Sequence, residues 1–197
     1  MREVELKAVV DDWAERRRRV EAAGGVLTFA GRLEDRRYDT PTRELARRDE
    51  VLRLRVYRSA ERTSAEIGWK GAVGYDGGYK VREEVETGTD DPGATARILE
   101  QLGYVVTRAI DREIAQYELD GTIVRFERYP RMDDLVEVEG SPEGIERAIA
   151  AIGIPRAEFT AERLPEFVRR YQARTGTTAA LSDDEAAGTA HYALEDA

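Results

Sequence analysis

The sequence contains no cysteine, and among its 197 residues there is one histidine, His191. Without cysteine the chain cannot form disulfides, thiolate metal sites or a cysteine nucleophile. A single histidine in a polar C-terminal segment argues against a multi-histidine zinc site and against a histidine general base. Any chemistry must therefore use carboxylates, lysine, arginine, tyrosine, hydroxyl groups or a metal held by oxygen.

Long apolar runs are also missing from the sequence. No stretch approaches the roughly 18 residues of a membrane span, and the N-terminus lacks the apolar core of a signal peptide, so we expect a cytoplasmic protein without a membrane partner. The formal net charge of −9 argues against nucleic acid as a partner, because non-specific binding to it needs a basic surface. A phosphorylated small molecule stays open, since a local basic cluster can outweigh the overall charge.

Capping residues and glycines mark the ends of the expected helices. Asp12, Asp91 and Ser141, the last two followed by proline, each predict a helix start, and residues 160–174 predict a fourth helix. Strand-like segments lie between the helices, and eight mostly antiparallel strands are enough to close a small barrel. They are expected at residues 3–8, 32–39, 51–58, 63–70, 79–87, 107–118, 122–128 and 135–139.

The chain divides into one expected domain and a tail. Residues 1–175 hold all the predicted helices and strands. Residues 176–197 are small, polar and acidic, a composition that offers little apolar surface to bury. We therefore expect residues 176–197 to form a disordered acidic tail.

Glutamates recur on alternate residues of three predicted strands. The letters EVE occur at residues 3–5, 84–86 and 137–139. Side chains two residues apart in a strand share a face, so each of these strands has an acidic face and an apolar face. Other predicted strands alternate in the same way with basic residues, as Arg53 and Arg55 do between leucine and valine.

Two architectures accept this pattern. The apolar faces could form a barrel core with the charged faces in water, or they could pack outward against helices with the charged faces lining a tunnel. Four helices with apolar stripes need a surface to cover, which favours the tunnel. A tunnel lined by both signs of charge should hold something that pairs with them. Basic side chains suit the oxygens of a polyphosphate and glutamates suit Mg²⁺ or Mn²⁺, so a metal-bound triphosphate satisfies both.

The opening residues EVELK resemble the E-x-E-x-K signature of the CYTH superfamily, the triphosphate tunnel metalloenzymes. This superfamily includes class IV adenylyl cyclases, thiamine triphosphatases and inorganic tripolyphosphatases. The resemblance covers about residues 1–175 and implies an α+β fold, an eight-stranded antiparallel β-barrel that forms a triphosphate tunnel, with helices packed outside. Further motifs follow in the family's order: LRLR at 52–55, WKG at 69–71, REEVE at 82–86 and VEVEG at 136–140.

The resemblance also implies roles for individual residues. The implied metal ligands are Glu3, Glu5, Glu127, Glu137 and Glu139. The implied catalytic residues are Lys7, Arg53, Arg55 and Lys70. The implied substrate-binding residues are Arg82, Arg112, Arg125, Glu84 and Glu86. Tyr57, Glu66 and Lys80 are left outside the site as ordinary surface residues.

Three positions depart from the family's pattern. Many members have aspartate where this chain has Glu127, and a basic residue where it has Ile110. The family's D-x-aromatic-aromatic-D stretch reads DRRYD at residues 35–39. These departures bear on the subfamily more than on the superfamily.

The leading functional prediction is a class IV adenylyl cyclase-like enzyme that converts ATP to cyclic AMP and pyrophosphate with Mg²⁺ or Mn²⁺, as a monomer or homodimer. The long glycine-rich hairpin before KVREEVE and the interposed helices favour this branch and that of the thiamine triphosphatases. One alternative is a triphosphatase that hydrolyses thiamine triphosphate, a nucleoside triphosphate or inorganic tripolyphosphate. Another is a non-catalytic module that binds a triphosphate or polyphosphate.

Overall fold

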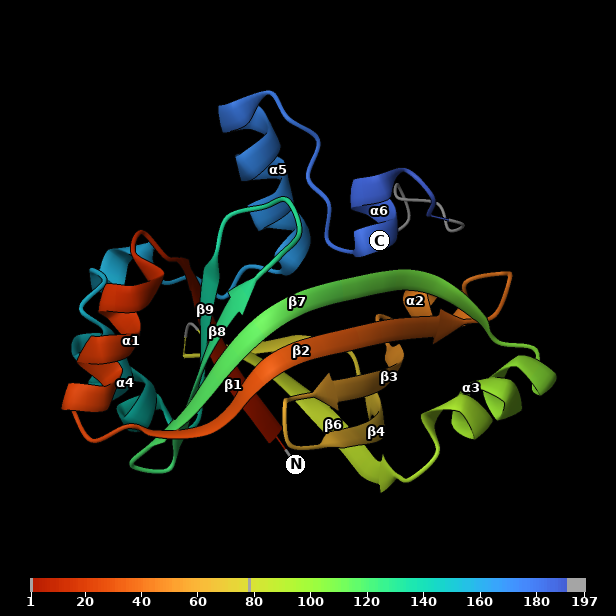
Figure 1. Ribbon diagram of the computed structural model, residues 1–197, viewed down its shortest axis with the longest axis horizontal. Helices are drawn as coiled ribbons and strands as arrows, with labels where there is room; N and C mark the ends of the chain where they lie inside the picture. The colour runs from red at the N-terminus through yellow and green to blue at the C-terminus, as the bar shows by residue number, and fades with distance from the viewer. Residues whose placement is uncertain (1, 78, 191–197) are drawn as a thin grey trace.

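The structure is a computed structural model that describes residues 2–77 and 79–190, without the side chains of residues 2, 3, 79 and 80 (Figure 1). The strands are β1 (Arg2–Val9), β2 (Val26–Asp39), β3 (Val51–Arg58), β4 (Thr63–Lys70), β5 (Gly74–Asp76), β6 (Tyr79–Thr89), β7 (Val105–Leu119), β8 (Thr122–Arg128) and β9 (Leu135–Glu139). The helices are α1 (Trp13–Ala22), α2 (Glu44–Arg47), α3 (Pro92–Gln101), α4 (Pro142–Ile152), the 3₁₀ turn η1 (Arg156–Glu158), α5 (Leu164–Thr175) and α6 (Asp183–Ala187).

Eight of these strands close into an antiparallel barrel. They follow the order β1-β9-β8-β7-β2-β3-β4-β6, and β6 pairs back onto β1 to complete the ring. Strand β5 pairs with β6 outside the ring. Closure pairs both edges of the sheet, which an open sheet would leave exposed to other chains. The predicted α+β fold with an eight-stranded antiparallel barrel is confirmed.

The main helices begin where their capping residues predict. Asp12 accepts a hydrogen bond from the backbone N–H of Glu15 at 2.9 Å, and Ser141 accepts one from Gly144 at 3.1 Å. Helix α5 begins at Leu164 rather than near residue 160, because Thr160 instead pairs its backbone with Lys7 of β1. None of the helices that the structure describes is long and apolar enough to span a membrane.

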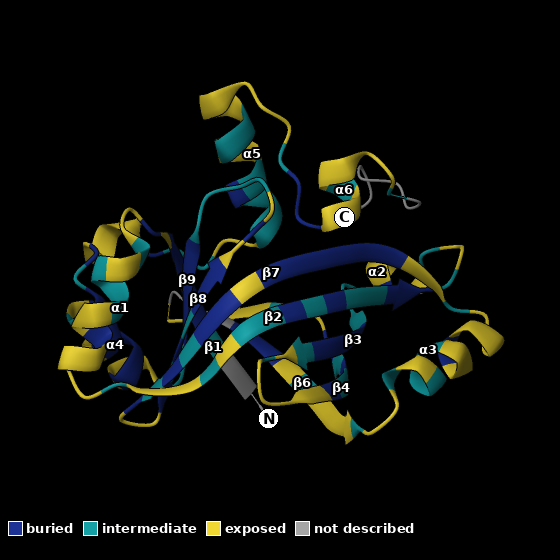
Figure 2. Cartoon of the chain, viewed as in Figure 1, coloured by how far each residue is buried: buried dark blue, intermediate teal, exposed yellow. Residues whose placement is uncertain are grey.

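The hydrophobic core lies between the barrel and its helices, and not inside the barrel. Leu6, Val124 and Phe126 on the outer faces of the strands pack with Ile145 and Ile149 of α4. A second cluster joins barrel strands to α3 on the other side of the molecule (Figure 1). Figure 2 shows that most of β7 is buried. The apolar faces therefore point outward, and the charged faces are left to line the interior.

Residues 176–190 pack against the barrel. The backbones of Ala180 and Arg131 exchange two hydrogen bonds, at 2.8 and 3.0 Å, and Leu181 accepts one from the N–H of Asp111 at 2.7 Å. Ala180 and Leu181 are buried, the latter beside Phe167 of α5. The expectation of a disordered tail is therefore corrected for residues 176–190, because the backbones of Asp111 on β7 and of Arg131 between β8 and β9 form hydrogen bonds with this segment. Residues 191–197 lie outside the described residues.

Candidate functional site

The interior of the barrel is a charged cavity of about 640 Å³. This volume is in the range of cavities that enclose a small ligand. The side chain of Glu3 lies outside the described residues, although its backbone is part of β1. All the other predicted site residues line the cavity: Glu5, Lys7, Arg53, Arg55, Lys70, Arg82, Glu84, Glu86, Arg112, Arg125, Glu127, Glu137 and Glu139.

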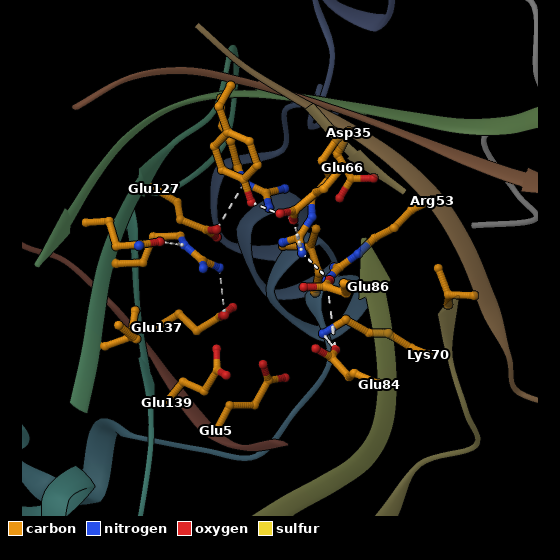
Figure 3. A pocket seen from close by; sticks show the side chains of 18 of the residues that line it. Glu5, Asp35, Arg53, Glu66, Lys70, Glu84, Glu86, Glu127, Glu137 and Glu139 are labelled. Carbon is orange, nitrogen blue, oxygen red and sulfur yellow. Dashed lines mark hydrogen bonds and ion pairs between the residues drawn. The ribbon is translucent and has the colours of Figure 1, made fainter. Parts of the chain in front are cut away.

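Carboxylates gather where β1 pairs with β9. The register places Glu5 directly opposite Glu139 and Lys7 opposite Glu137. Figure 3 shows Glu5, Glu137 and Glu139 on one side of the cavity, facing Lys70, Glu84 and Glu86 on the other. The ammonium Nζ of Lys7 lies 3.0 Å from Glu5 and 2.6 Å from Glu137. Like charges directly opposite each other destabilise a sheet, so this corner favours a bound cation.

Glu137 is held in its ionised form. Burial by itself would raise the pKa of the carboxyl group, but Lys7 and Arg125 outweigh it and hold the pKa well below its usual range. The guanidinium of Arg125 lies 3.1 Å from Glu137 and also donates to Gln116 at 3.0 Å. Glu137 therefore carries a negative charge at neutral pH.

The opposite wall of the cavity carries arginine and lysine side chains that are paired with glutamates on other strands. Arg53 donates to Glu86 at 2.8 Å, and Lys70 forms an ion pair with Glu84. Arg55 pairs with Glu86 and with Glu66, the latter at 2.5 Å. These bonds fix the direction of long side chains that would otherwise lose conformational entropy when a ligand binds.

Sequence reasoning missed Glu66 and Tyr57, which both line the cavity. The hydroxyl of Tyr57 donates to Glu66 at 3.1 Å. A signal for Glu66 was present, because it stands four residues before Lys70 on the same strand face. Tyr57 belongs to an aromatic pair, in which its ring centroid lies 5.5 Å from that of Phe29.

Two predicted site residues, Glu127 and Arg82, form hydrogen bonds or ion pairs with other residues of the protein. Glu127 is 2% exposed, lies 3.0 Å from Arg112, and accepts a hydrogen bond from the hydroxyl of Tyr129 at 2.5 Å. Arg82 donates to the backbone carbonyls of Gly71 and Asp49, both at 2.6 Å. Their roles toward metal and substrate stay predictions, and a ligand would have to share these side chains with the fold.

The two ends of the cavity differ in chemistry. One end is lined by Asp49, Arg163 and Leu164, which lie at and before the start of β3 and α5. The other end is lined by Phe29 and Tyr57 together with polar groups of the β3–β4 turn region. An elongated ligand would therefore meet an ionic end and an aromatic end.

The carboxylates do not form a ready metal cage by themselves. Within the described residues, no group of three or more histidine, cysteine or acidic side chains is close enough to hold an ion. The donor set still suits a hard cation, because Glu5, Glu137 and Glu139 offer the oxygen ligands that Mg²⁺ and Mn²⁺ prefer.

A closed barrel with a charged interior and helices outside defines a tunnel protein, and comparison with known proteins gives the family. The model of the CYTH domain matches residues 1–147, so the chain belongs to the CYTH domain family. No curated protein matches the sequence.

Solved structures share the fold at low sequence identity. A candidate adenylate cyclase from Vibrio parahaemolyticus has a TM-score of 0.71 at 18% identity, over 85% of this chain and 97% of that one. A protein from Pyrococcus horikoshii has a TM-score of 0.70 at 21% identity, over 85% and 98%. A candidate adenylyl cyclase from Hippeastrum, described as having a dominant triphosphatase activity, has a TM-score of 0.60 at 16% identity, over 92% and 98%.

Proposed function

We propose that this chain is a divalent-cation-dependent enzyme that acts on a triphosphate, with conversion of ATP to cyclic AMP and pyrophosphate as the leading reaction. The observation that carries the proposal is that one cavity presents arginine and lysine side chains together with a corner of carboxylates. Arg53, Arg55 and Lys70 point inward from one wall, and carboxylates gather at the β1–β9 corner opposite. A triphosphate with its cation has complementary charges for both sets of side chains.

Glu5, Glu137 and Glu139 would hold Mg²⁺ or Mn²⁺. Their fit rests on the pairing of Glu5 directly with Glu139, a like-charge contact that a cation would relieve. When bound, the cation would neutralise the charge of the phosphate oxygens and would orient the triphosphate of the substrate for in-line attack. Lys7, which lies between Glu5 and Glu137, neutralises the corner in the ligand-free chain and is placed to turn toward a phosphate.

The basic wall would act on the leaving group. In the cyclase reaction the ribose 3′-hydroxyl attacks the α-phosphorus, the bond from that phosphorus to its bridging oxygen breaks, and pyrophosphate leaves. Negative charge grows on pyrophosphate in this step, and fixed cations stabilise it without reorganisation. Arg53 and Arg55 are held in direction by Glu86, so they are suited to this role.

The aromatic end of the cavity supports a substrate that carries an organic ring. Phe29 and Tyr57 are half-buried and line the cavity. Half-buried aromatic side chains offer faces on which a nucleobase can stack. Inorganic tripolyphosphate would leave this end unused, so a nucleoside triphosphate fits the whole lining better.

Hydrolysis is the second candidate reaction. The Hippeastrum protein, described as having a dominant triphosphatase activity, has the same fold, and the charges of the tunnel would serve either reaction. Thiamine triphosphate, a nucleoside triphosphate or tripolyphosphate would be the substrate. A non-catalytic binding module would use the basic wall but would not need the acidic corner.

Product identification tests the proposal. Wild-type protein is incubated with ATP, thiamine triphosphate and tripolyphosphate, each with Mg²⁺ and with Mn²⁺, and the products are resolved by chromatography and phosphorus NMR. Cyclic AMP with pyrophosphate supports the cyclase, and orthophosphate supports the triphosphatase. Arg53→Gln should lose activity, whereas Arg47→Gln, an exposed arginine on α2, should keep it. No product from any of the three substrates would contradict an enzymatic function.

A further inference from the structure

Arg37 belongs to a row of arginines that sequence reasoning did not include. It lies on β2, in register with Arg53 of β3 on one side and with Arg108 of β7 on the other. Residues paired in this way share a face of the sheet. Arg37 lines the cavity, as Arg53 does, so its guanidinium adds a further positive charge to the tunnel wall.

The strongest opposite charge acting on Arg37 is that of Asp35, but no hydrogen bond or ion pair joins the Arg37 guanidinium to another residue in the part of the chain that the structure describes. The Nε of Arg37 is closed off from solvent. Arg53 and Arg112 differ, because each lies within 3.0 Å of a glutamate. A buried donor without a hydrogen-bond partner lowers the stability of the folded chain. A ligand that accepts a hydrogen bond from Arg37 would remove this penalty.

The electrostatic surroundings of Arg37 are positive. Its pKa falls to about 10, chiefly because of burial, although Asp35 opposes the shift. The charges of Arg108 and Arg53 lower it further. Arg37 stays protonated at neutral pH, so the field around it favours an anion.

We propose that Arg37 is a further substrate-binding residue that holds the terminal phosphate of the triphosphate. This inference rests on the proposed function and deepens it. Arg37 stands near the end of β2, beside Arg53, whereas Phe29 stands near the start of β2 at the aromatic end. A nucleoside triphosphate whose base stacks on Phe29 would extend its phosphates toward Arg37. The planar guanidinium suits the oxygens of a phosphate group.

If Arg37 holds the terminal phosphate, the effect of replacing it should depend on the number of phosphates in the nucleotide. In Arg37→Gln the affinity for ATP should fall about ten- to a hundredfold, the usual range for losing a hydrogen bond to a charged group. The affinity for ADP, which lacks the terminal phosphate, should stay within about twofold of the wild type. Arg37→Lys keeps the charge and should recover part of the affinity for ATP.

Isothermal titration calorimetry with ATP and with ADP, in the presence of a chelator to prevent metal-dependent turnover, measures these affinities for the wild type and both variants. Arg47→Gln serves as the matched control on an exposed arginine. Equal affinity of wild type and Arg37→Gln for ATP would overturn the assignment of Arg37, and so would an equal loss for ATP and ADP. If the wild type binds neither nucleotide with or without Mg²⁺, the proposed function itself fails.

Thermal unfolding of the ligand-free proteins separates binding from a structural role. Because burial and the charges of Arg108 and Arg53 outweigh the attraction of Asp35 and disfavour the charged guanidinium of Arg37, Arg37→Gln should leave the melting temperature unchanged or raise it. A melting temperature clearly below that of the wild type would show that Arg37 supports the fold, and would overturn the proposal.

Discussion

The carboxylate of Glu137 lies between cations from two neighbouring strands, Lys7 of β1 and Arg125 of β8. These cations hold its pKa well below the usual range in spite of burial. A carboxyl group whose pKa is lower in the folded chain than in the unfolded chain stabilises the fold only while it is ionised. Glu137 therefore links the site to the acid stability of the whole barrel.

Glu137→Gln should lower the free energy of unfolding at neutral pH by about 3 kcal/mol, because it leaves buried cations without their shared partner. The unfolded pKa of glutamate is about 4.3. The difference from wild type should therefore be constant between about pH 8 and 5, and should shrink as the pH falls below about 4.5 toward the folded pKa. Urea unfolding followed across this range checks the prediction. A difference that already shrinks between about pH 8 and 6 would mean that the pKa is raised instead.

For individual residues, the sequence predicts which side chains face the inside of the barrel, but not which of them contact one another. Alternation placed Arg53 and Arg55 correctly on the cavity wall. Arg37 was missed because charged residues stand on both faces of β2 there, so Asp35, Arg36 and Arg37 do not alternate with apolar residues. Its lack of a hydrogen-bond or ion-pair partner among the described residues depends on the register with β3 and β7, which local sequence does not encode.

Individual elements were predictable where their signals are local. The starts of α1, α3 and α4 follow from capping hydrogen bonds within three residues. The packing of residues 176–190 depends on distant partners, Arg131 and Asp111, and composition alone predicted disorder there. The apolar residues at the C-terminal end of α3 show the same limit, because Leu99 is buried whereas Leu102, the residue that follows the helix, is 69% exposed.

Leu181→Ala should destabilise the protein by about 2–5 kcal/mol as a core truncation. Leu181 is 1% exposed and packs with Ile110 and Phe167, so the variant leaves a cavity between the C-terminal segment and the barrel. Leu102→Ala is the matched control, since an exposed leucine should change stability by less than about 0.5 kcal/mol. Urea unfolding measures both. Equal stability of Leu181→Ala and wild type would mean that residues 176–190 do not pack as described.

The whole molecule has a formal charge of −9, yet the cavity of its barrel is lined by basic as well as acidic side chains. Closure of the ring makes this possible, because each strand turns its apolar face to the outer helices and its charged face to the cavity. A polyanion inside a cavity responds to the nearest charges more than to the net charge. We therefore expect binding and turnover to depend on two separate sets of side chains, with the basic side chains holding the phosphates and the acidic corner holding the cation.

The direct test of this division compares binding with turnover in wild type and Glu137→Gln. Affinity for ATP is measured by calorimetry, and product formation is measured with Mg²⁺ and in excess chelator. We expect wild type to turn over ATP only with the divalent cation. We expect Glu137→Gln to bind ATP at least as well, since a repulsive charge is gone, while its turnover falls about a hundredfold or more. Full turnover by wild type in chelator, or unchanged turnover by Glu137→Gln, would contradict the account.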